Sequence, residues 1–400
     1  MSILEHVEAL PPDPIFGLGA IIKKDPREHK VDLTVGIYHN ENLQTVTMEA
    51  VKEAEKRLLA TEKNKAYLPM GGKEDFVQAS RALVFGETFA KSECKRFMGV
   101  QSLGGTSALR IGGEILSAEV SKQIYMSDPT WPNHPSIFKA CGMEIKKYPY
   151  YNDVTHTIDF DRMLDSLAKA PERSVILLHT CCHNPTGCDL EKEQWKELST
   201  FMLKHKLVPF FDFAYQGFAQ GVEEDAWPIH HFAGMGHELF VAHSFSKFFG
   251  LYGERTGALH VLVKDEGTAK RSSTVLKQVI RESFSNPPRH GASLVALIMH
   301  DEELKKMWLD ELTGMRKRIN EMRGEFVDAL ELKVGANKFG FLKNRHGLFS
   351  MLGLKNEIVD QLTQKYGLYL TQSGRINLSG LNRKNIAYVV DAIVDIVNLK

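Results

Sequence analysis

The chain has 400 residues, 43% hydrophobic and 25% charged, and its 50 lysines and arginines equal its 50 aspartates and glutamates. This is the composition of a soluble globular protein with two or three domains, and the balanced charge leaves no excess of basic residues that would indicate binding to nucleic acid or an anionic membrane. With no signal peptide, no apolar run as long as a membrane span and an odd number of cysteines, five, we expect a cytoplasmic protein without a disulfide framework.

The N-terminal region contains three prolines within residues 11–14, and proline disfavours helix there. Residues 11–30 are therefore predicted to begin as an extended arm that carries Ile15, Phe16 and Leu18. Such an arm needs an apolar surface to cover. A partner subunit and the arm's own domain are both possible surfaces.

The first regular elements are predicted to be a strand over residues 31–37, with a turn at Gly36, and a helix over residues 47–60. In residues 102–110 two glycines then precede Thr106 and a helical pattern. Free backbone N–H groups and a hydroxyl at a helix N-terminus can bind a phosphate. An ordinary glycine turn before a helix would give the same pattern.

Two prolines fix the loop of residues 128–134 around Trp131, whose flat indole could stack on an aromatic cofactor or pack in the core.

Apolar strands are predicted at residues 175–179, 207–211 and 239–242, with helical patterns between them. This alternation indicates a parallel sheet covered on both faces, with the ligand crevice at the carboxyl ends of its strands. The polar residues that follow those ends are Asn184, Asp212, Tyr215, Ser244 and Lys247.

Residues 181–188 contain three cysteines and a histidine, but they lack the C-x-x-C spacing and the second ligand pair of a zinc site. We therefore expect no metal there.

The stretch from Ser244 to Gly257 indicates different chemistry. Lys247 lies among phenylalanines, and poor solvation lowers the pKa of an amine and makes it nucleophilic. Arg255 lies between two glycines that leave room for a bulky anion. A ligand with one aldehyde and one phosphate, such as pyridoxal phosphate, would suit this stretch, although most lysines beside aromatic residues simply lie at the surface.

The last hundred residues are predicted to form a second, smaller domain of helices and short strands. A strand over residues 258–263 comes before it, and an amphipathic helix begins near residue 300. The later elements are strands over 347–352 and 374–378 and helices over 356–366 and 386–397.

Four motifs occur together in this order: HNPTG at 183–187, DFAYQG at 212–217, SFSK at 244–247 with Arg255, and GRIN at 374–377. With them, nearly the whole chain resembles the aspartate and aromatic-amino-acid aminotransferases, which are fold-type I pyridoxal-phosphate enzymes. The resemblance implies an α/β fold. Its large domain, residues 46–310, would have a mostly parallel seven-stranded sheet covered by helices. Residues 1–45 would form an arm and part of the small domain, and residues 311–400 the rest of a smaller α+β domain.

The resemblance also implies roles for individual residues. Lys247 would bind the cofactor covalently and then move a proton on the substrate, and Asp212 would pair with the pyridinium nitrogen. Tyr215 and Asn184 would bond the ring's 3-oxygen, and Trp131 would stack on the ring.

The remaining implied roles concern the phosphate, the substrate and the residues behind the ring. Arg375 would bind the substrate α-carboxylate, in a site that Gly36, Trp131 and Asn184 also line. His134 and His179 would support Asp212, or they are ordinary core histidines. The phosphate would be held by Gly105, Thr106, Ser244 and Arg255.

In the family the active site lies at a dimer interface, so the resemblance assigns Tyr67 and Arg281 to the neighbouring subunit's site. It also implies cis peptide bonds before Pro129 and Pro185. The expected function is amino transfer from an L-amino acid to 2-oxoglutarate within a homodimer. Aspartate is the favoured donor and an aromatic amino acid the alternative.

Two other functions fit the sequence less well. A binding protein without catalysis would lack Lys247, Asp212 or Arg375, and a lyase would not need Arg281. The chain departs from the family pattern at three positions, which bear on its substrate preference: His39, Phe248 and Gly253.

Overall fold

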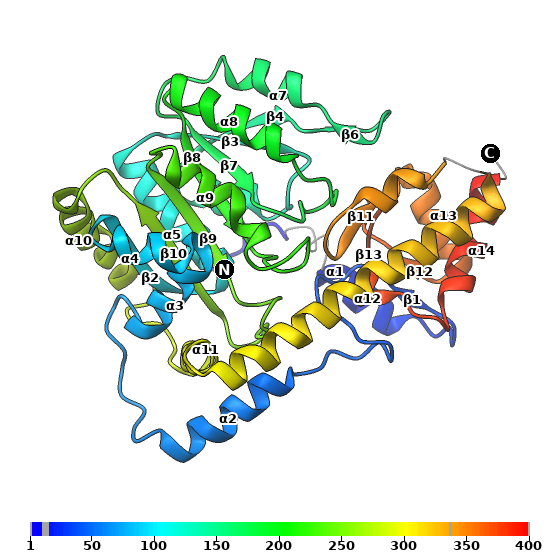
Figure 1. Cartoon of the computed structure of the whole chain (residues 1–400). Coiled ribbons are helices and arrows are strands. Elements are labelled where there is room, and N and C mark those ends of the chain that lie inside the picture. Colours follow the sequence, from blue (N-terminus) through cyan, green and yellow to red (C-terminus); the bar gives the residue numbers. More distant parts are fainter. Residues whose placement is uncertain (1, 10–15, 336–337, 399–400) are drawn as a thin grey trace.

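A seven-stranded sheet forms the centre of the larger part of the molecule in the computed structural model, which describes residues 2–9, 16–335 and 338–398 (Figure 1). Strand β10 is antiparallel to both of its neighbours, and the other neighbouring strands are parallel. The prediction of a mostly parallel seven-stranded sheet is therefore confirmed. In spatial order the strands are β2 (Phe97–Leu103), β10 (Thr256–Leu262), β9 (Leu239–Ser244), β8 (Val208–Phe213), β7 (Val175–His179), β3 (Gln123–Asp128) and β4 (Glu144–Pro149).

Helices cover both faces of this sheet because its strands are apolar on both sides. Alternate residues of one strand enter different cores: Phe210 belongs to one cluster and Phe211 to the other. One face packs against α5 (Gly104–Glu119), α6 (His134–Ala140) and α10 (Glu266–Ser283). The opposite face packs against α3 (Glu74–Phe85), α7 (Phe160–Leu167), α8 (Lys192–Lys204) and α9 (Trp227–Gly234).

The C-terminal elements gather at one side, and helix α12 (Glu302–Val334) connects them to the rest of the chain (Figure 1). This helix contacts α2 (Glu49–Thr61) and α11 (His290–His300) and, further along, α14 (Ile386–Asn398). The N-terminal strand β1 (Val31–Asp32) pairs with β12 (Leu368–Tyr369), so an early segment joins the C-terminal elements. The others there are the antiparallel pair β11 (Phe349–Met351) and β13 (Arg375–Asn377), and α13 (Asn356–Tyr366). The short helices η3 (Gly340–Asn344) and η4 (Leu378–Gly380) also lie there, in contact with α12. Smaller elements elsewhere are α4 (Glu87–Ser92), β5 (Tyr151–Asn152), β6 (Thr157–Ile158), η1 (Cys94–Arg96) and η2 (Glu224–Ala226).

The prediction of an extended arm is wrong where the structure can test it. Residues 16–24 form helix α1 (Phe16–Lys24), which includes Phe16 and Leu18. A proline restricts itself and the residue before it, so the prolines up to residue 14 leave the following residues free to form a helix. The start of the predicted arm, including Ile15, lies outside the described residues.

The predicted strand over residues 31–37 is also shorter than expected. It ends at Asp32, and although the Leu33 carbonyl still accepts from the Asn377 backbone N–H, side chains instead of a neighbouring strand bond the later carbonyls. Arg375 donates to the Thr34 carbonyl, and Asn377 donates to the carbonyls of Val35 and Ile37.

The peptide bonds before Pro129 and Pro185 are both cis, as predicted. Among the described residues, none of the helices has the length and apolarity to cross a membrane.

Candidate active site

A cavity of about 570 Å³ opens at the carboxyl ends of the parallel strands, where the sequence predicted the ligand crevice. Small-molecule sites commonly have volumes of this order. Eleven of the predicted site residues line the cavity. They are Gly36, Gly105, Thr106, Trp131, Asn184, Asp212, Tyr215, Ser244, Lys247, Arg255 and Arg375.

Lys247 follows strand β9, in a turn whose phenylalanines point into the core and leave its amine beside the cavity. The Lys247 Nζ atom lies 5.2 Å from the centroid of the Tyr215 ring. Burial lowers the pKa of Lys247 to about 8, and although Asp212 opposes that shift, the cations Arg255 and Arg375 add to it. About a tenth of this amine is therefore neutral, and nucleophilic, at pH 7, far more than of an ordinary lysine.

Asp212 is the last but one residue of strand β8, and its carboxylate points into the cavity. Burial by itself would raise the pKa of Asp212. The hydrogen bond with His134, whose Nε2 lies 3.0 Å from Oδ2, and the charge of Lys247 outweigh burial and hold the pKa below its usual value. Asp212 is thus an anion that can pair with a positively charged ring nitrogen.

Two further histidine contacts support Asp212 from behind. The Nδ1 atom of His134 lies 2.8 Å from the Thr130 hydroxyl, and the backbone N–H of Asn184 donates to His179 Nδ1 over 3.2 Å. Burial lowers the pKa of His179 to about 3, so this ring is neutral. Although His134, His179 and Asp212 are close enough together to hold a metal ion, hydrogen bonds already occupy nitrogen atoms of both rings.

An anion-binding corner lies where helix α5 begins, beside Ser244 and Arg255. A Cβ atom added at Gly105 would lie 3.0 Å from Ser244 Cβ and 3.4 Å from its hydroxyl oxygen, so a side chain there would crowd this corner. Arg255 donates to the carbonyls of Tyr252 and Leu103, which hold its guanidinium next to the helix N-terminus. Backbone N–H groups at a helix start, a hydroxyl and a guanidinium together fit a phosphate.

Arg375 enters the same cavity from strand β13 and is only 2% exposed. It donates to Asn184 Oδ1 over 3.0 Å and to the Thr34 carbonyl over 2.7 Å, and its guanidinium carbon lies 4.1 Å from the Phe349 ring centroid. Its Nε atom is buried without a hydrogen-bond partner. Since no carboxylate in the described part of the chain forms an ion pair with this cation, it can bind the carboxylate of a ligand.

Tyr67 and Arg281 lie outside this cavity, although Tyr67 lines a neighbouring hollow together with Arg255. Tyr67 is 91% exposed, and Arg281 lies exposed on α10 with a bond to Ser285. Neither lines the cavity.

The sequence interpretation missed several residues that line the cavity. Phe349 packs against Arg375, and its strand was predicted, but no pattern placed that strand beside the lysine. The other missed lining residues are Val35, Ile37, Leu109, Asn133, Ala214, Ser246 and Tyr252; of these, Ser246 lies next to the predicted lysine in the sequence.

The three departures from the family pattern lie in different places. Gly253 lines the cavity. Phe248 is fully buried, and the Trp308 ring contacts it from α12, so it does not reach the cavity. His39 is partly buried, and its backbone amide donates to the Ser379 hydroxyl.

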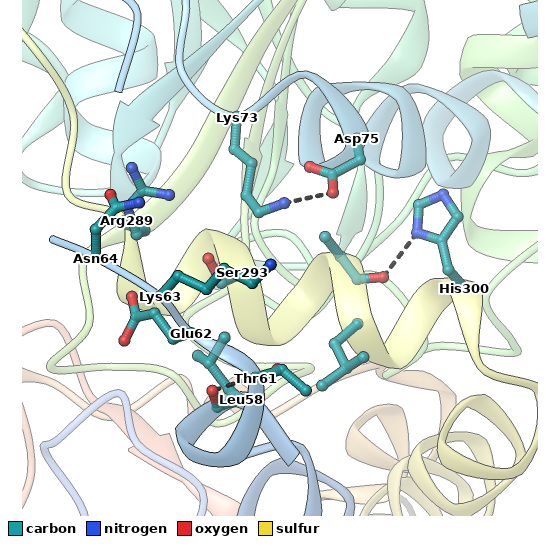
Figure 2. Close-up of a pocket in the computed structure, with 12 residues that line it drawn as sticks. Leu58, Thr61, Glu62, Lys63, Asn64, Lys73, Asp75, Arg289, Ser293 and His300 are labelled. Carbon is teal, nitrogen blue, oxygen red and sulfur yellow. Dashed lines mark hydrogen bonds and ion pairs between the residues drawn. The ribbon is translucent and has the colours of Figure 1, made fainter. Parts of the chain in front are cut away.

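A second hollow, of about 370 Å³, lies between the end of α2 and helix α11 (Figure 2). Figure 2 shows Lys73 paired with Asp75 and the His300 ring bonded within its own helix. None of the predicted site residues lines this hollow. The site predicted from the sequence is therefore the cavity beside Lys247.

That cavity combines an amine of lowered pKa, a buried carboxylate, an anion-binding corner and a guanidinium. This set can hold a phosphate-bearing aldehyde together with a carboxylate-bearing substrate, and it can transfer a proton between them.

Comparison with known proteins gives a consistent result. Residues 28–393 match the family model described as aminotransferase class I and II. The chain is 44% identical to an aspartate aminotransferase of Haemophilus influenzae, and the match covers 99% of this chain and 100% of the relative.

Two solved structures are similar over 99% of this chain and 100% of their own. One is an aromatic-amino-acid aminotransferase from Burkholderia pseudomallei covalently bound to pyridoxal phosphate, with 38% identity and a TM-score of 0.95. The other is an aromatic amino acids aminotransferase from Psychrobacter sp. B6 cocrystallised with aspartic acid, with 36% identity and a TM-score of 0.96.

Proposed function

The chain belongs to the class I and II aminotransferases, and from this membership we propose that it transfers the amino group of L-aspartate to 2-oxoglutarate with pyridoxal 5′-phosphate as cofactor. One observation supports the proposal most: Lys247, Asp212, Arg255 and Arg375 line a single cavity. The phosphate, the ring nitrogen, the aldehyde and the substrate carboxylate each find a matching group there.

The residues of the cavity fit the cofactor. Ser244, Arg255 and the start of α5 would hold its phosphate, in a corner that a side chain at Gly105 would fill. Asp212 would keep the ring nitrogen protonated, and the Tyr215 hydroxyl and the Asn184 amide would face its 3-oxygen. Bound in this way, pyridoxal phosphate supplies an electron sink for the electrons released at the substrate Cα.

The reaction then depends on how these residues hold the substrate and move its proton. Arg375 would fix the α-carboxylate, which orients the Cα–H bond toward the lysine. The Lys247 amine would take the proton from the substrate Cα and deliver it to C4′ of the cofactor. This task suits a base whose pKa is about 8. Lys247, Asp212 and Tyr215 are the proposed catalytic residues.

A panel of amino donors with 2-oxoglutarate as acceptor tests the proposed activity. We expect aspartate to give the highest kcat/KM and phenylalanine and tyrosine lower values. Since one similar aromatic aminotransferase crystallised with aspartic acid, an aromatic donor is the second candidate. A panel in which phenylalanine or tyrosine exceeds aspartate would select that alternative, and turnover of none of them would refute the proposed function.

We further propose that the enzyme is a cytoplasmic homodimer in which each active site contains residues of both subunits. Tyr67 and Arg281 are exposed and outside the chain's own cavity, as expected of residues that complete a neighbour's site. The five free thiols suit a reducing compartment. The domain division at residues 45 and 310 stays a prediction.

Mixing two inactive variants tests the shared site. Lys247→Ala and Arg281→Ala chains, combined under conditions that exchange subunits, should regain aspartate turnover. In the mixed dimer one site contains both intact groups, and random exchange would restore about a quarter of wild-type activity if all sites exchange freely. Each variant incubated alone is the control. If activity after mixing stays at the sum of the two controls, although exchange is confirmed by mass spectrometry, Arg281 does not act across an interface.

A further inference from the structure

A buried histidine, His243, lies directly behind the proposed catalytic pair, on the opposite face of the sheet. In the parallel pair β8 and β9 it is in register with Phe213, and the preceding residues Asp212 and Ala242 are in register on the cavity side. The His243 side chain is fully buried and does not line the cavity.

The His243 ring contacts three phenylalanine rings: Phe245 is tilted against it at 4.7 Å, and the two rings that stack on it are sequence neighbours of the catalytic residues. Phe213 follows Asp212, and its ring stacks on His243 at 5.3 Å between centroids and 24° between planes. Phe248 follows Lys247, and its ring stacks at 5.2 Å and 29°. One flat ring therefore connects the strand that carries the carboxylate to the turn that carries the amine.

Hydrogen bonds fix the orientation of this ring. Gln216 uses its amide N–H groups on the carbonyls of Leu83 and Val222, so its Oε1 atom must accept from His243 Nε2, 2.9 Å away. The Nδ1 atom then accepts from the Ser80 hydroxyl at 3.0 Å.

A second buried histidine completes the network. His260 Nε2 lies 2.8 Å from the Ser80 oxygen and donates to it. Gly99 gives His260 its space, because an added Cβ there would lie 3.1 Å from Nδ1 of the ring. Burial holds the pKa of His243 well below its usual value, so the ring stays neutral and retains one proton arrangement.

We propose that His243 is a positioning residue, which holds Asp212 and Lys247 in their relative placement through the rings of Phe213 and Phe248. The inference rests on the proposed roles of that pair. Without the ring, the two phenylalanines lose the surface that separates them, and the turn around Lys247 loosens and admits water. Better solvation of the amine favours its charged form.

The pKa of Lys247 in the full-length chain before cofactor is added tests this inference. It can be measured by reductive methylation over a range of pH, with the Lys247 peptide quantified by mass spectrometry. We expect a value of about 8 in the wild type. His243→Ala should raise it by about one unit, which lowers the neutral fraction near pH 7 about tenfold. Uptake of added pyridoxal 5′-phosphate at pH 7, followed by absorbance, should slow by a similar factor.

His237→Ala is the matched control. His237 is also buried, stacks on Phe232 and bonds to Ser199, and none of the three lines the cavity. It should lower the melting temperature without changing the Lys247 pKa. His243→Phe should keep the pKa near the wild-type value, since it retains a flat ring, although Ser80 and Gln216 lose their partner.

Two results would overturn the positioning role. One is an unchanged Lys247 pKa in His243→Ala, and the other is a His243→Phe chain with the same shift as His243→Ala. If the alanine variant does not fold, His243→Leu fills the space without a flat ring and takes its place. Because methylation reports the free amine whatever the chain catalyses, a failure here is distinguishable from a failure of the proposed function, which the donor panel measures.

Discussion

Replacing Lys247 by alanine is expected to lower kcat for aspartate by about 10³- to 10⁴-fold. The amine is the one group of the cavity with a pKa close to neutral, so it can both attack the cofactor aldehyde and move the substrate proton. General acid–base catalysis by itself contributes about 10²- to 10⁴-fold, and the covalent attachment adds to this. The measurement is kcat with saturating aspartate and 2-oxoglutarate in the presence of excess pyridoxal phosphate.

Lys204→Ala provides the matched control for that experiment. Lys204 is an exposed lysine at the end of α8, outside the cavity, and its loss should leave kcat unchanged. A Lys247→Ala protein that folds, binds the cofactor and keeps more than about a tenth of wild-type kcat would show that another group moves the proton.

The second large effect is expected at Arg281, and it depends on the substrate. Aspartate and 2-oxoglutarate each carry two carboxylates, and Arg375 can bind only the one beside the reacting carbon. Loss of one partner of a desolvated charge pair costs about 2–5 kcal/mol. At about 1.4 kcal/mol per tenfold change, Arg281→Ala should lower kcat/KM for aspartate by roughly 30-fold to a few thousand-fold.

Aromatic donors supply the internal comparison, because they have no distal charge. Arg281→Ala should largely spare half-reactions of phenylalanine and tyrosine with the bound cofactor, whereas Arg375→Ala should impair aspartate and phenylalanine alike. Arg271→Ala on the same helix, with its guanidinium bonded only to Thr268 among the described contacts, should change neither. Equal losses for aspartate and phenylalanine in Arg281→Ala would contradict the assignment and make His39 the next candidate.

The sequence predicted the sheet and the cavity better than the parts of the site that come from elsewhere in the chain. Apolar strands followed by polar turns placed Asp212 and Lys247 at one edge, because parallel strands present their carboxyl ends together. Arg375 was assigned through a motif, and only the fold shows that β13 brings it against Asn184, a residue 191 positions away.

The remaining features depend on long-range packing that no local pattern contains. Ser80 and His243 meet across 163 residues of sequence, and neither has a motif that indicates the other. Helix α1 differs from the prediction because a proline restricts only itself and the residue before it, so the prolines of residues 11–14 do not prevent the helix that follows. The assignment of Tyr67 and Arg281 to a partner subunit came from the family resemblance and is still untested.

The most direct measurement of the central claim is the position of the cofactor on the chain. Protein loaded with pyridoxal 5′-phosphate is reduced with borohydride, digested and mapped by mass spectrometry. If Lys247 forms the active site with Asp212, Arg255 and Arg375, the cofactor mass is found on the one peptide that contains Lys247. Stoichiometric label on any other lysine, with Lys247 unmodified, would contradict the account.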